Sequence, residues 1–256
     1  MNGRSPMNPD DLEIAGFFLL VVLFELWERR RPARQIDRFA DLKIDLLSFT
    51  LAVAMNRALT HTFRVVTQSI SPAAVTGWLA AVQSLPGVVK LVIAMFVIDF
   101  TIYWIHRAQH RFDLTWRTHA WHHTIEHMYW LAGFRTSFFH SFIYNIPQAG
   151  IPMLVFNLSP MMTGIGYTAG LFVQFWEHTN LKLDIGQWRW LFITPQYHRV
   201  HHSATRYGRM NLGTTFSLWD RMFGTFVDPA TMPDSFPLGL GEPIPTKEMP
   251  RMIVGV

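Results

Sequence analysis

Three stretches decide the architecture of this chain: His106-Arg-Ala-Gln-His110, His119-Ala-Trp-His122-His123 and His198-Arg-Val-His201-His202. Eleven of the twelve histidines lie between residues 106 and 202, and eight of them belong to these clusters. Residues three and four apart share a helix face, so each cluster is expected to present two or three imidazoles on one side of one element. Neutral imidazole is the commonest protein ligand for metals. Eight such ligands are too many for one ion, so the pattern predicts two ions, each with several nitrogen ligands and an open position.

The alternative is that these histidines are packed, hydrogen-bonded side chains. A single histidine on an apolar face is usually of that kind, and one H-x3-H pair arises by chance. Two H-x2-H-H repeats beside an H-x3-H pair favour metal binding for the set. His178 either caps a helix or is a ninth ligand. His127 and His140 are open between the two roles, and His61 lies apart from the clusters and is expected to be structural or solvated.

The composition is typical of a membrane protein. Half of the 256 residues are hydrophobic and only 16% are charged, whereas soluble domains average about 25% charged residues. The net charge of +4 comes from short basic segments beside apolar runs, which favours cytoplasmic membrane loops over nucleic-acid binding. The chain has no Cys, which excludes disulfides, Cys-ligated zinc and Cys-ligated iron–sulfur clusters. Electrons for any redox reaction must therefore come from elsewhere.

The order of apolar segments predicts where the clusters meet. An N-terminal anchor over residues 12–28 is followed by an Arg-rich stretch, which the positive-inside rule places in the cytoplasm. Further apolar segments cover residues 42–59, 88–105, 138–158 and 161–176. We therefore expect an all-α, multi-pass protein of about four to five spans, in which one domain covers residues 1–256. Three spans followed by a hairpin bring all three clusters and His178 to the cytoplasmic side, in a histidine-rich helical cap.

Sites made only of nitrogen ligands suit iron, zinc, copper or nickel. Two histidine-bound ions beside a membrane suggest that a di-iron centre activates O2 and oxidises an unactivated C–H bond of a lipid. Asp45 and Asp99 lie inside apolar segments, where an ionisable group usually has a partner or a function. Metal-bound imidazoles also need polar neighbours to orient them. The candidates for this role by sequence proximity are Asp99, Glu126, Asp184, Asn211 and Asp220.

At these residues the chain resembles the fatty acid hydroxylase / sterol desaturase superfamily of integral-membrane di-iron oxygenases. Besides the three clusters, Glu177-His178-Thr-Asn180, Asn211-Leu-Gly213 and Leu218-Trp-Asp-Arg-Met-Phe-Gly-Thr225 match its motifs. The likeness covers a histidine-motif core of about residues 90–228. It implies a helical membrane fold and O2-dependent hydroxylation or desaturation of a lipid. Its implied metal ligands are His106, His110, His119, His122, His123, His178, His198, His201 and His202.

The implied cofactor is a pair of iron ions, for which zinc can substitute. The chain differs from some members at Gln174, where they carry a further histidine, and it lacks a cytochrome b5-like H-P-G-G segment. The electron donor is therefore expected to be a separate protein of the ferredoxin or cytochrome b5 type. Fatty acyl, sterol, hopanoid, alkylglycerol and carotenoid substrates all remain open.

Two other classes compete with this interpretation. A membrane metal transporter or storage protein would carry its ligands near the middle of its spans, but here the clusters begin where the apolar segments end. A haem-binding membrane cytochrome needs only two or four axial histidines, which leaves both H-x2-H-H stretches unexplained. The sequence therefore favours the di-iron oxidoreductase.

Overall fold

The computed structural model describes residues 9–70, 76–233 and 235–256, and its regular elements within them are helical. The α-helices are α1 (Pro9–Arg30), α2 (Leu42–Ser69), α3 (Gly77–Gln83), α4 (Gly87–Arg111), α5 (Asp113–Ala120), α6 (Phe138–Gly150), α7 (Pro160–His178), α8 (Pro195–His201), α9 (Leu218–Phe223) and α10 (Met249–Val254). Short 3-10 turns and one π-helical turn lie between them, namely η2 (His122–Thr124), η3 (Ala132–Phe134), η4 (Ile151–Val155, the π turn), η5 (Gly186–Trp190), η6 (Arg206–Arg209) and η7 (Pro229–Thr231). The all-helical expectation is thus confirmed.

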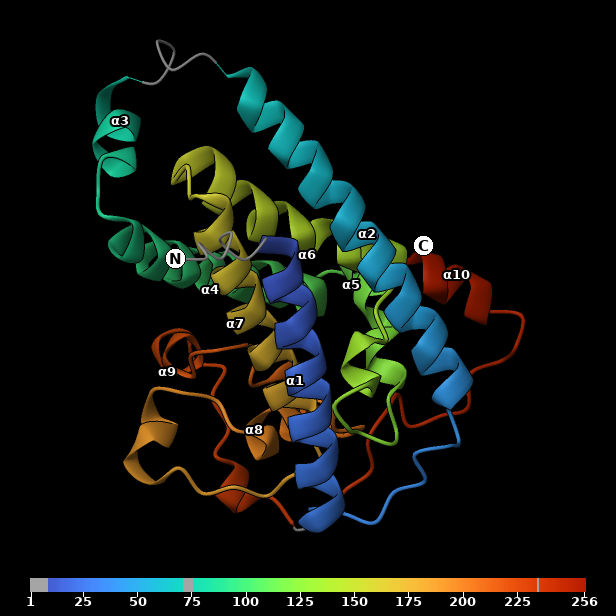
Figure 1. The fold of residues 1–256 in the computed structure, drawn as a ribbon. Coiled ribbons are helices and arrows are strands. Elements are labelled where there is room, and N and C mark those ends of the chain that lie inside the picture. The colour runs from blue at the N-terminus through green and yellow to red at the C-terminus, as the bar shows by residue number, and fades with distance from the viewer. Residues whose placement is uncertain (1–8, 71–75, 234) are drawn as a thin grey trace, which may run out of the picture.

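The long helices pack as a bundle in which α1 lies along α7 and α2 lies along α6 (Figure 1). Gly16 lets α1 approach α7 closely, because a Cβ there would lie 2.8 Å from Thr168 Cγ2. Between α2 and α6, Asn56 donates a hydrogen bond of 2.7 Å to the side chain of Asn145. The chain after α7 folds into short elements, of which α8 and α9 lie toward the end of the bundle where α1 finishes, whereas α10 packs against α5 and α6 (Figure 1).

One helix in the described residues, α4, is long and apolar enough to cross a membrane. The length and composition of the helices do not by themselves establish the expected four to five spans, because the other long helices are shorter, less apolar or carry more charge. Helix α2 extends to Ser69, beyond the predicted end at residue 59, and carries Lys43, Asp45, Arg57 and Arg64. Helix α6 ends after 13 residues and passes into η4.

The two carboxylates expected to need partners both have them. Asp45 Oδ1 lies 2.6 Å from Arg135 Nη2, and Tyr129 donates a hydrogen bond of 2.9 Å to Asp45 Oδ2. Asp99 accepts hydrogen bonds from the side chains of Thr214 and Trp219, both at 2.8 Å. These contacts connect α2 and α4 to the loops that follow the histidine clusters.

The Arg-rich turn after α1 lies against the end of α7. Glu28 is fully buried and accepts hydrogen bonds from the Thr179 hydroxyl at 2.6 Å and the Asn180 amide at 2.7 Å. Its other carboxylate oxygen lies 2.7 Å from Arg38 Nη2. The basic turn and His178 are therefore at the same end of the bundle.

Candidate metal centre

Nine buried histidines meet where α4 and α7 end, and they form two groups. Within each group, one nitrogen from every ring lies within 4.8 Å of one nitrogen from every other ring. The first histidine group consists of His106, His110, His119, His123 and His201. The second histidine group consists of His122, His178, His198 and His202. These nine are the residues that the sequence predicted as ligands.

Each H-x2-H-H stretch contributes to both groups. His119 and His123 belong to the first group, and His122 between them belongs to the second. Conversely, His201 belongs to the first group although its stretch otherwise supplies the second. This differs from the expectation that each cluster presents all its imidazoles to one side. Two rings four residues apart share a direction, whereas the ring between them points elsewhere.

The spacing of nitrogen atoms fits metal coordination. In the first group, the Nε2 atom of His119 lies 3.0 Å from that of His106 and 3.1 Å from that of His123. In the second group, the Nε2 atom of His178 lies 3.1 Å from that of His122 and 3.0 Å from that of His198. Two nitrogens bound to one ion at about 2.1 Å and at right angles are about 3.0 Å apart. The nitrogen positions are therefore compatible with ligands around two common centres.

Backbone carbonyl groups fix the tautomers of four of these rings. The Nδ1–H groups of His106 and His201 donate to the carbonyls of Leu212 at 2.7 Å and Met210 at 2.9 Å. In the second group, His122 Nδ1 lies 3.1 Å from the Arg135 carbonyl and His178 Nδ1 lies 3.0 Å from the Gln174 carbonyl. A proton held on Nδ1 leaves the Nε2 lone pair free for a metal.

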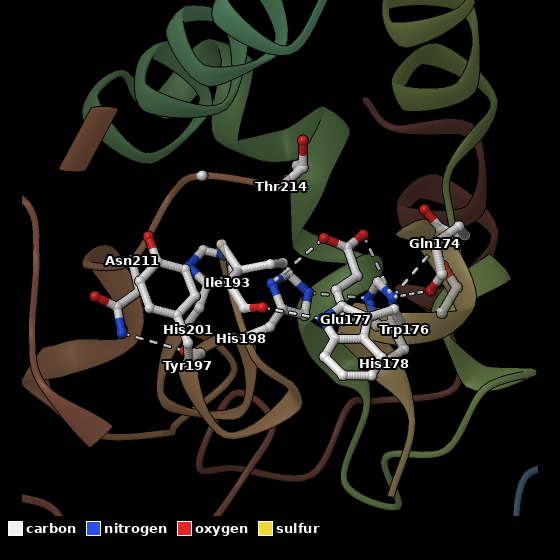
Figure 2. A network of polar contacts seen from close by, with 12 residues as sticks. Gln174, Trp176, Glu177, His178, Ile193, Tyr197, His198, His201, Asn211 and Thr214 are labelled. Carbon is white, nitrogen blue, oxygen red and sulfur yellow. Dashed lines mark hydrogen bonds and ion pairs between the residues drawn. The ribbon is translucent and has the colours of Figure 1, made fainter. Parts of the chain in front are cut away.

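The expected orienting residues act through a loop rather than on the imidazoles themselves. Asp220 is fully buried, accepts hydrogen bonds of 2.7 Å from the amides of Leu212 and Gly213, and also accepts from the Tyr197 hydroxyl. Asn211, with a φ of 58°, donates to the Tyr197 carbonyl at 3.2 Å (Figure 2). Asp220 therefore holds the residue whose carbonyl orients His106.

Not all expected orienting residues lie at this site. Asp99 contacts the same loop through Thr214 and Thr215. Glu126 and Asp184 are exposed, and Asp184 accepts a hydrogen bond of 2.8 Å from the Gly186 amide. Their positions give neither of them a role at the histidines.

Sequence reasoning missed Glu177, which is buried beside the second histidine group. Its carboxylate lies 3.5 Å from His178 Nδ1 and 3.9 Å from His198 Nδ1 (Figure 2). His198 Nδ1 and Glu177 Oε2 are both buried without a hydrogen-bond partner in the described part of the chain. An acidic residue ending an apolar helix directly before a histidine was the available signal.

His140 lies beside both groups but belongs to neither. Its Nδ1 atom is 3.0 Å from His119 Nδ1, and its ring stacks on Tyr144 with centroids 4.0 Å apart. Since His119 Nε2 faces the first group, His140 contacts the outer nitrogen of that ring. His127 and His61 lie outside both groups, and His61 is exposed.

The protein environment keeps the imidazoles of the two histidine groups neutral. Burial lowers the pKa of His119, His122 and His123 well below the usual range of imidazole, and neighbouring imidazoles lower it further. The pKa values of His198, His201 and His202 are lowered by the same two causes. Neutral imidazole is the form that binds metal, so the site is prepared for cations at neutral pH.

A cavity of about 270 Å³, the bundle cavity, lies between α2, α4, α6 and α7 and reaches both histidine groups. Histidines form one end of its lining: His106, His119, His122, His140, His178 and His198. Its α4 side is largely apolar, with Leu91, Met95 and Ile98. The cavity therefore joins an apolar lining from α4 to the imidazoles of both histidine groups.

Comparison with known proteins agrees with this geometry. A family model described as fatty acid hydroxylase matches residues 91–225. The chain is 35% identical over 155 residues to an alkylglycerol monooxygenase of Xenopus tropicalis, which covers 59% of this chain and 33% of the relative. It is 34% identical over 161 residues to the alkylglycerol monooxygenase of Danio rerio, which covers 61% of this chain and 34% of the relative.

A bacterial relative is more distant in sequence. The ornithine lipid hydroxylase OlsE of Rhizobium tropici is 29% identical over 157 residues, which covers 60% of this chain and 46% of the relative. The matches thus span about a third to a half of the length of these curated relatives. No solved structure matches the chain. Because the family model covers more than half of its residues, this protein belongs to the fatty acid hydroxylase family.

Proposed function

We propose that this protein is an integral-membrane, O2-dependent oxidoreductase that hydroxylates or desaturates a lipid at a pair of histidine-bound iron ions. The observation that carries this proposal is the pair of buried histidine groups at one end of the bundle cavity. The named relatives are monooxygenases and hydroxylases, which favours hydroxylation. Two groups of five and four imidazoles also exceed what a haem, with two axial positions, requires.

In this proposal the nine grouped histidines are the metal ligands, five at one ion and four at the other. When bound, the iron pair supplies oxygen activation and C–H oxidation. The chain's own contribution is to hold neutral imidazoles in fixed tautomers, through backbone carbonyls such as those of Leu212 and Arg135. Glu177 is placed to accept a hydrogen bond from His198 Nδ1–H after a small side-chain movement, which would orient that ring.

The bundle cavity supports an amphiphilic lipid as substrate. Opposite its apolar α4 side, α6 contributes a polar stripe to the lining, made of Ser141, Tyr144, Asn145 and Gln148. A hydrocarbon chain can lie against α4 while an ether, ester, amide or hydroxyl group meets this stripe. Burial of the histidines limits the contact of the reacting carbon with bulk water.

Membrane insertion with the metal site on the cytoplasmic side is the topology that these features favour. Besides α4, helix α1 exposes a continuous apolar face that includes Phe18, Leu19 and Val22. Contiguous exposed apolar surface of this kind marks membrane contact. The Arg-rich turn after α1 lies at the same end as the histidines, and basic turns stay in the cytoplasm. Electrons would then come from a separate cytoplasmic donor of the ferredoxin or cytochrome b5 type, since the chain has no Cys.

An oxygen-isotope experiment tests the proposed activity. Membranes containing the wild-type protein or His122→Ala would be incubated with 18O2, a reducing system and alkylglycerol, ornithine-lipid and fatty-acyl substrates. We expect an 18O-labelled hydroxyl group, or a new double bond, in one lipid class with the wild type only. Equal oxidation by His122→Ala, inserted in equal amount, would contradict the assignment of the histidines as the reacting centre.

A further inference from the structure

A second cavity, of about 500 Å³, is lined by a different part of α8 from the histidines. Gln196 and Arg199 line it, whereas His198 and His202 belong to the second histidine group. Helix α8 therefore separates this cavity, here called the basic cavity, from the metal centre. Its volume is within the range of about 300–1,000 Å³ typical of small-molecule sites.

Cationic side chains outnumber acidic ones in the lining of the basic cavity. In the described part of the chain five basic residues line it, namely Arg34, Lys182, Arg189, Arg199 and Arg221. Two acidic residues, Asp184 and Asp228, also line it. Each of these carboxylates accepts a backbone hydrogen bond, Asp184 from Gly186 at 2.8 Å and Asp228 from Ala230 at 2.9 Å. The cavity therefore carries an excess of positive charge.

Arg199 is the one buried side chain among these five cations. It is 5% exposed, and its Nη2 group donates only to two backbone carbonyls, those of Thr179 at 3.3 Å and Leu181 at 3.4 Å. Its Nε is buried with no hydrogen-bond partner among the described residues.

Among the described residues, no carboxylate forms an ion pair with Arg199 at contact distance. The charge of Glu28 attracts Arg199 at a distance, but the Glu28 carboxylate makes its direct contacts elsewhere. It lies 2.7 Å from Arg38 and accepts hydrogen bonds from Thr179 and Asn180. Gln196 also has a buried oxygen, Oε1, without a partner in the described chain. Buried charged and polar groups are normally paired. A ligand oxygen that accepts a hydrogen bond would pair with Arg199 Nε, and a ligand hydroxyl group would donate to Gln196 Oε1.

Two further arginines of the cavity are held in place by aromatic rings. The Arg221 guanidinium carbon lies 3.6 Å from the centroid of Phe226, and that of Arg34 lies 4.4 Å from the centroid of Phe236. Stacking of this kind limits side-chain freedom and lowers the entropic cost of binding an anion. Guanidinium groups bind phosphate through parallel N–H···O bonds.

We propose that the basic cavity is a binding site for a phosphate group, with Arg199 at its base and Arg34 and Arg221 at its sides. The site is separate from the proposed lipid-oxidising centre and does not depend on that function. The phosphate is that of a membrane lipid headgroup or of a soluble phosphate ester. Trp188 and Trp190, on either side of the cavity-lining Arg189, are 60% and 59% exposed, as is common at a membrane interface.

Direct binding tests this proposal without any turnover. Full-length protein in phosphatidylcholine nanodiscs would be titrated with inorganic phosphate and with adenosine monophosphate by calorimetry. In a parallel arm, the thermal unfolding midpoint would be measured as phosphatidylglycerol replaces phosphatidylcholine. The variants are Arg199→Gln and Arg221→Gln, with Arg251→Gln, an exposed arginine of α10 outside the cavity, as the matched control.

We expect at least one arm to show binding that weakens by about tenfold or more in both cavity variants and is unchanged in Arg251→Gln. A response to phosphatidylglycerol alone identifies a lipid headgroup, and a response to a soluble probe identifies a soluble ester. If Arg199→Gln does not fold, Arg221→Gln decides, because Arg221 is only partly buried. Absence of binding in all arms, or equal binding by wild type and Arg221→Gln, would overturn the proposal.

Discussion

The Nε2 atoms of His123 and His201 lie 3.0 Å apart although 78 positions separate the two residues in the chain. Each H-x2-H-H stretch thus supplies two rings to one histidine group and one ring to the other. Both groups draw histidines from α5 with its following turn and from α8, so neither is complete until these segments bring their side chains together. Assembly of the two histidine groups is therefore coupled to the folding of these segments.

Replacing Asp220 should destabilise the loop that orients His106. In Asp220→Ala the buried amides of Leu212 and Gly213 and the Tyr197 hydroxyl lose their acceptor. Each unsatisfied buried donor costs about 1–3 kcal/mol, so we expect a loss of at least about 3 kcal/mol. The thermal unfolding midpoint should fall by about 6 °C or more. The control is Asp113→Ala, at an exposed position in α5, and equal midpoints for the two variants would refute this role.

A methyl group at Gly133 should displace His178. A Cβ at this position would lie 2.5 Å from His178 Cγ and 2.6 Å from its Nδ1. We expect Gly133→Ala to remain folded but to lose most of the metal bound by the second histidine group. Metal content and thermal unfolding should be compared with Gly87→Ala, where the new Cβ makes only ordinary contacts at 3.8 Å. Full metal content in Gly133→Ala would show that the close approach is unimportant.

Acidification should destabilise the metal-free protein. Above pH of about 6.5, these histidines are neutral in both the folded and the unfolded chain and contribute no pH dependence. Below this pH the histidines of the unfolded chain take up protons. The buried rings of the folded chain do not, because their pKa is lowered, so the free energy of unfolding falls as the pH falls. Each such histidine contributes up to about 1.4 kcal/mol per pH unit.

The measurement is urea unfolding of the chelator-treated protein between pH 7.5 and 5.5. His61→Ala, at an exposed position outside both groups, should show the same decline as the wild type. A free energy of unfolding that is constant over this range would mean that the grouped imidazoles are accessible to protons in the folded state.

Narrowing the bundle cavity should change which lipids are oxidised. Met95 lines the cavity from α4, and Met95→Trp would add a bulky ring to its apolar side. We expect a shift of product toward substrates with shorter hydrocarbon chains, measured by lipid mass spectrometry. Val92→Trp is the matched control, because Val92 is on α4 but 61% exposed and outside the lining. An identical product profile for Met95→Trp would argue against this cavity as the substrate site.

Much of the site follows from sequence because its signal is local. Spacings of three and four residues identified the histidine clusters, and the chain order of apolar segments predicted that they meet at one end of the bundle. What could not be predicted was the division of each stretch between two groups. That division depends on the end of α5 at Ala120, the η2 turn after it and the packing of α8, which are tertiary features.

The extent of the long helices and the neighbours of the grouped histidines were less predictable. Helix α2 continues ten residues past the expected end at residue 59, because polar residues such as His61 and Arg64 are compatible with helix although they interrupt the apolar run. Glu177 and the contact of His140 with His119 were missed, since one carboxylate and one histidine in apolar helices carry no spacing signal. Asp220 was identified, but its action through the Leu212 carbonyl requires the folded loop.

The most direct test of the account is the metal content per chain of the purified, iron-supplemented protein, measured by mass spectrometry. The wild type and His61→Ala should contain about two iron ions, as two groups of nitrogen ligands require. His122→Ala and His201→Ala, which remove one ligand from the second and first groups respectively, should each lose about one ion or more and all activity. A wild type without bound metal, or a metal content unaffected by both cluster variants, would contradict the account and leave the histidines with a structural role.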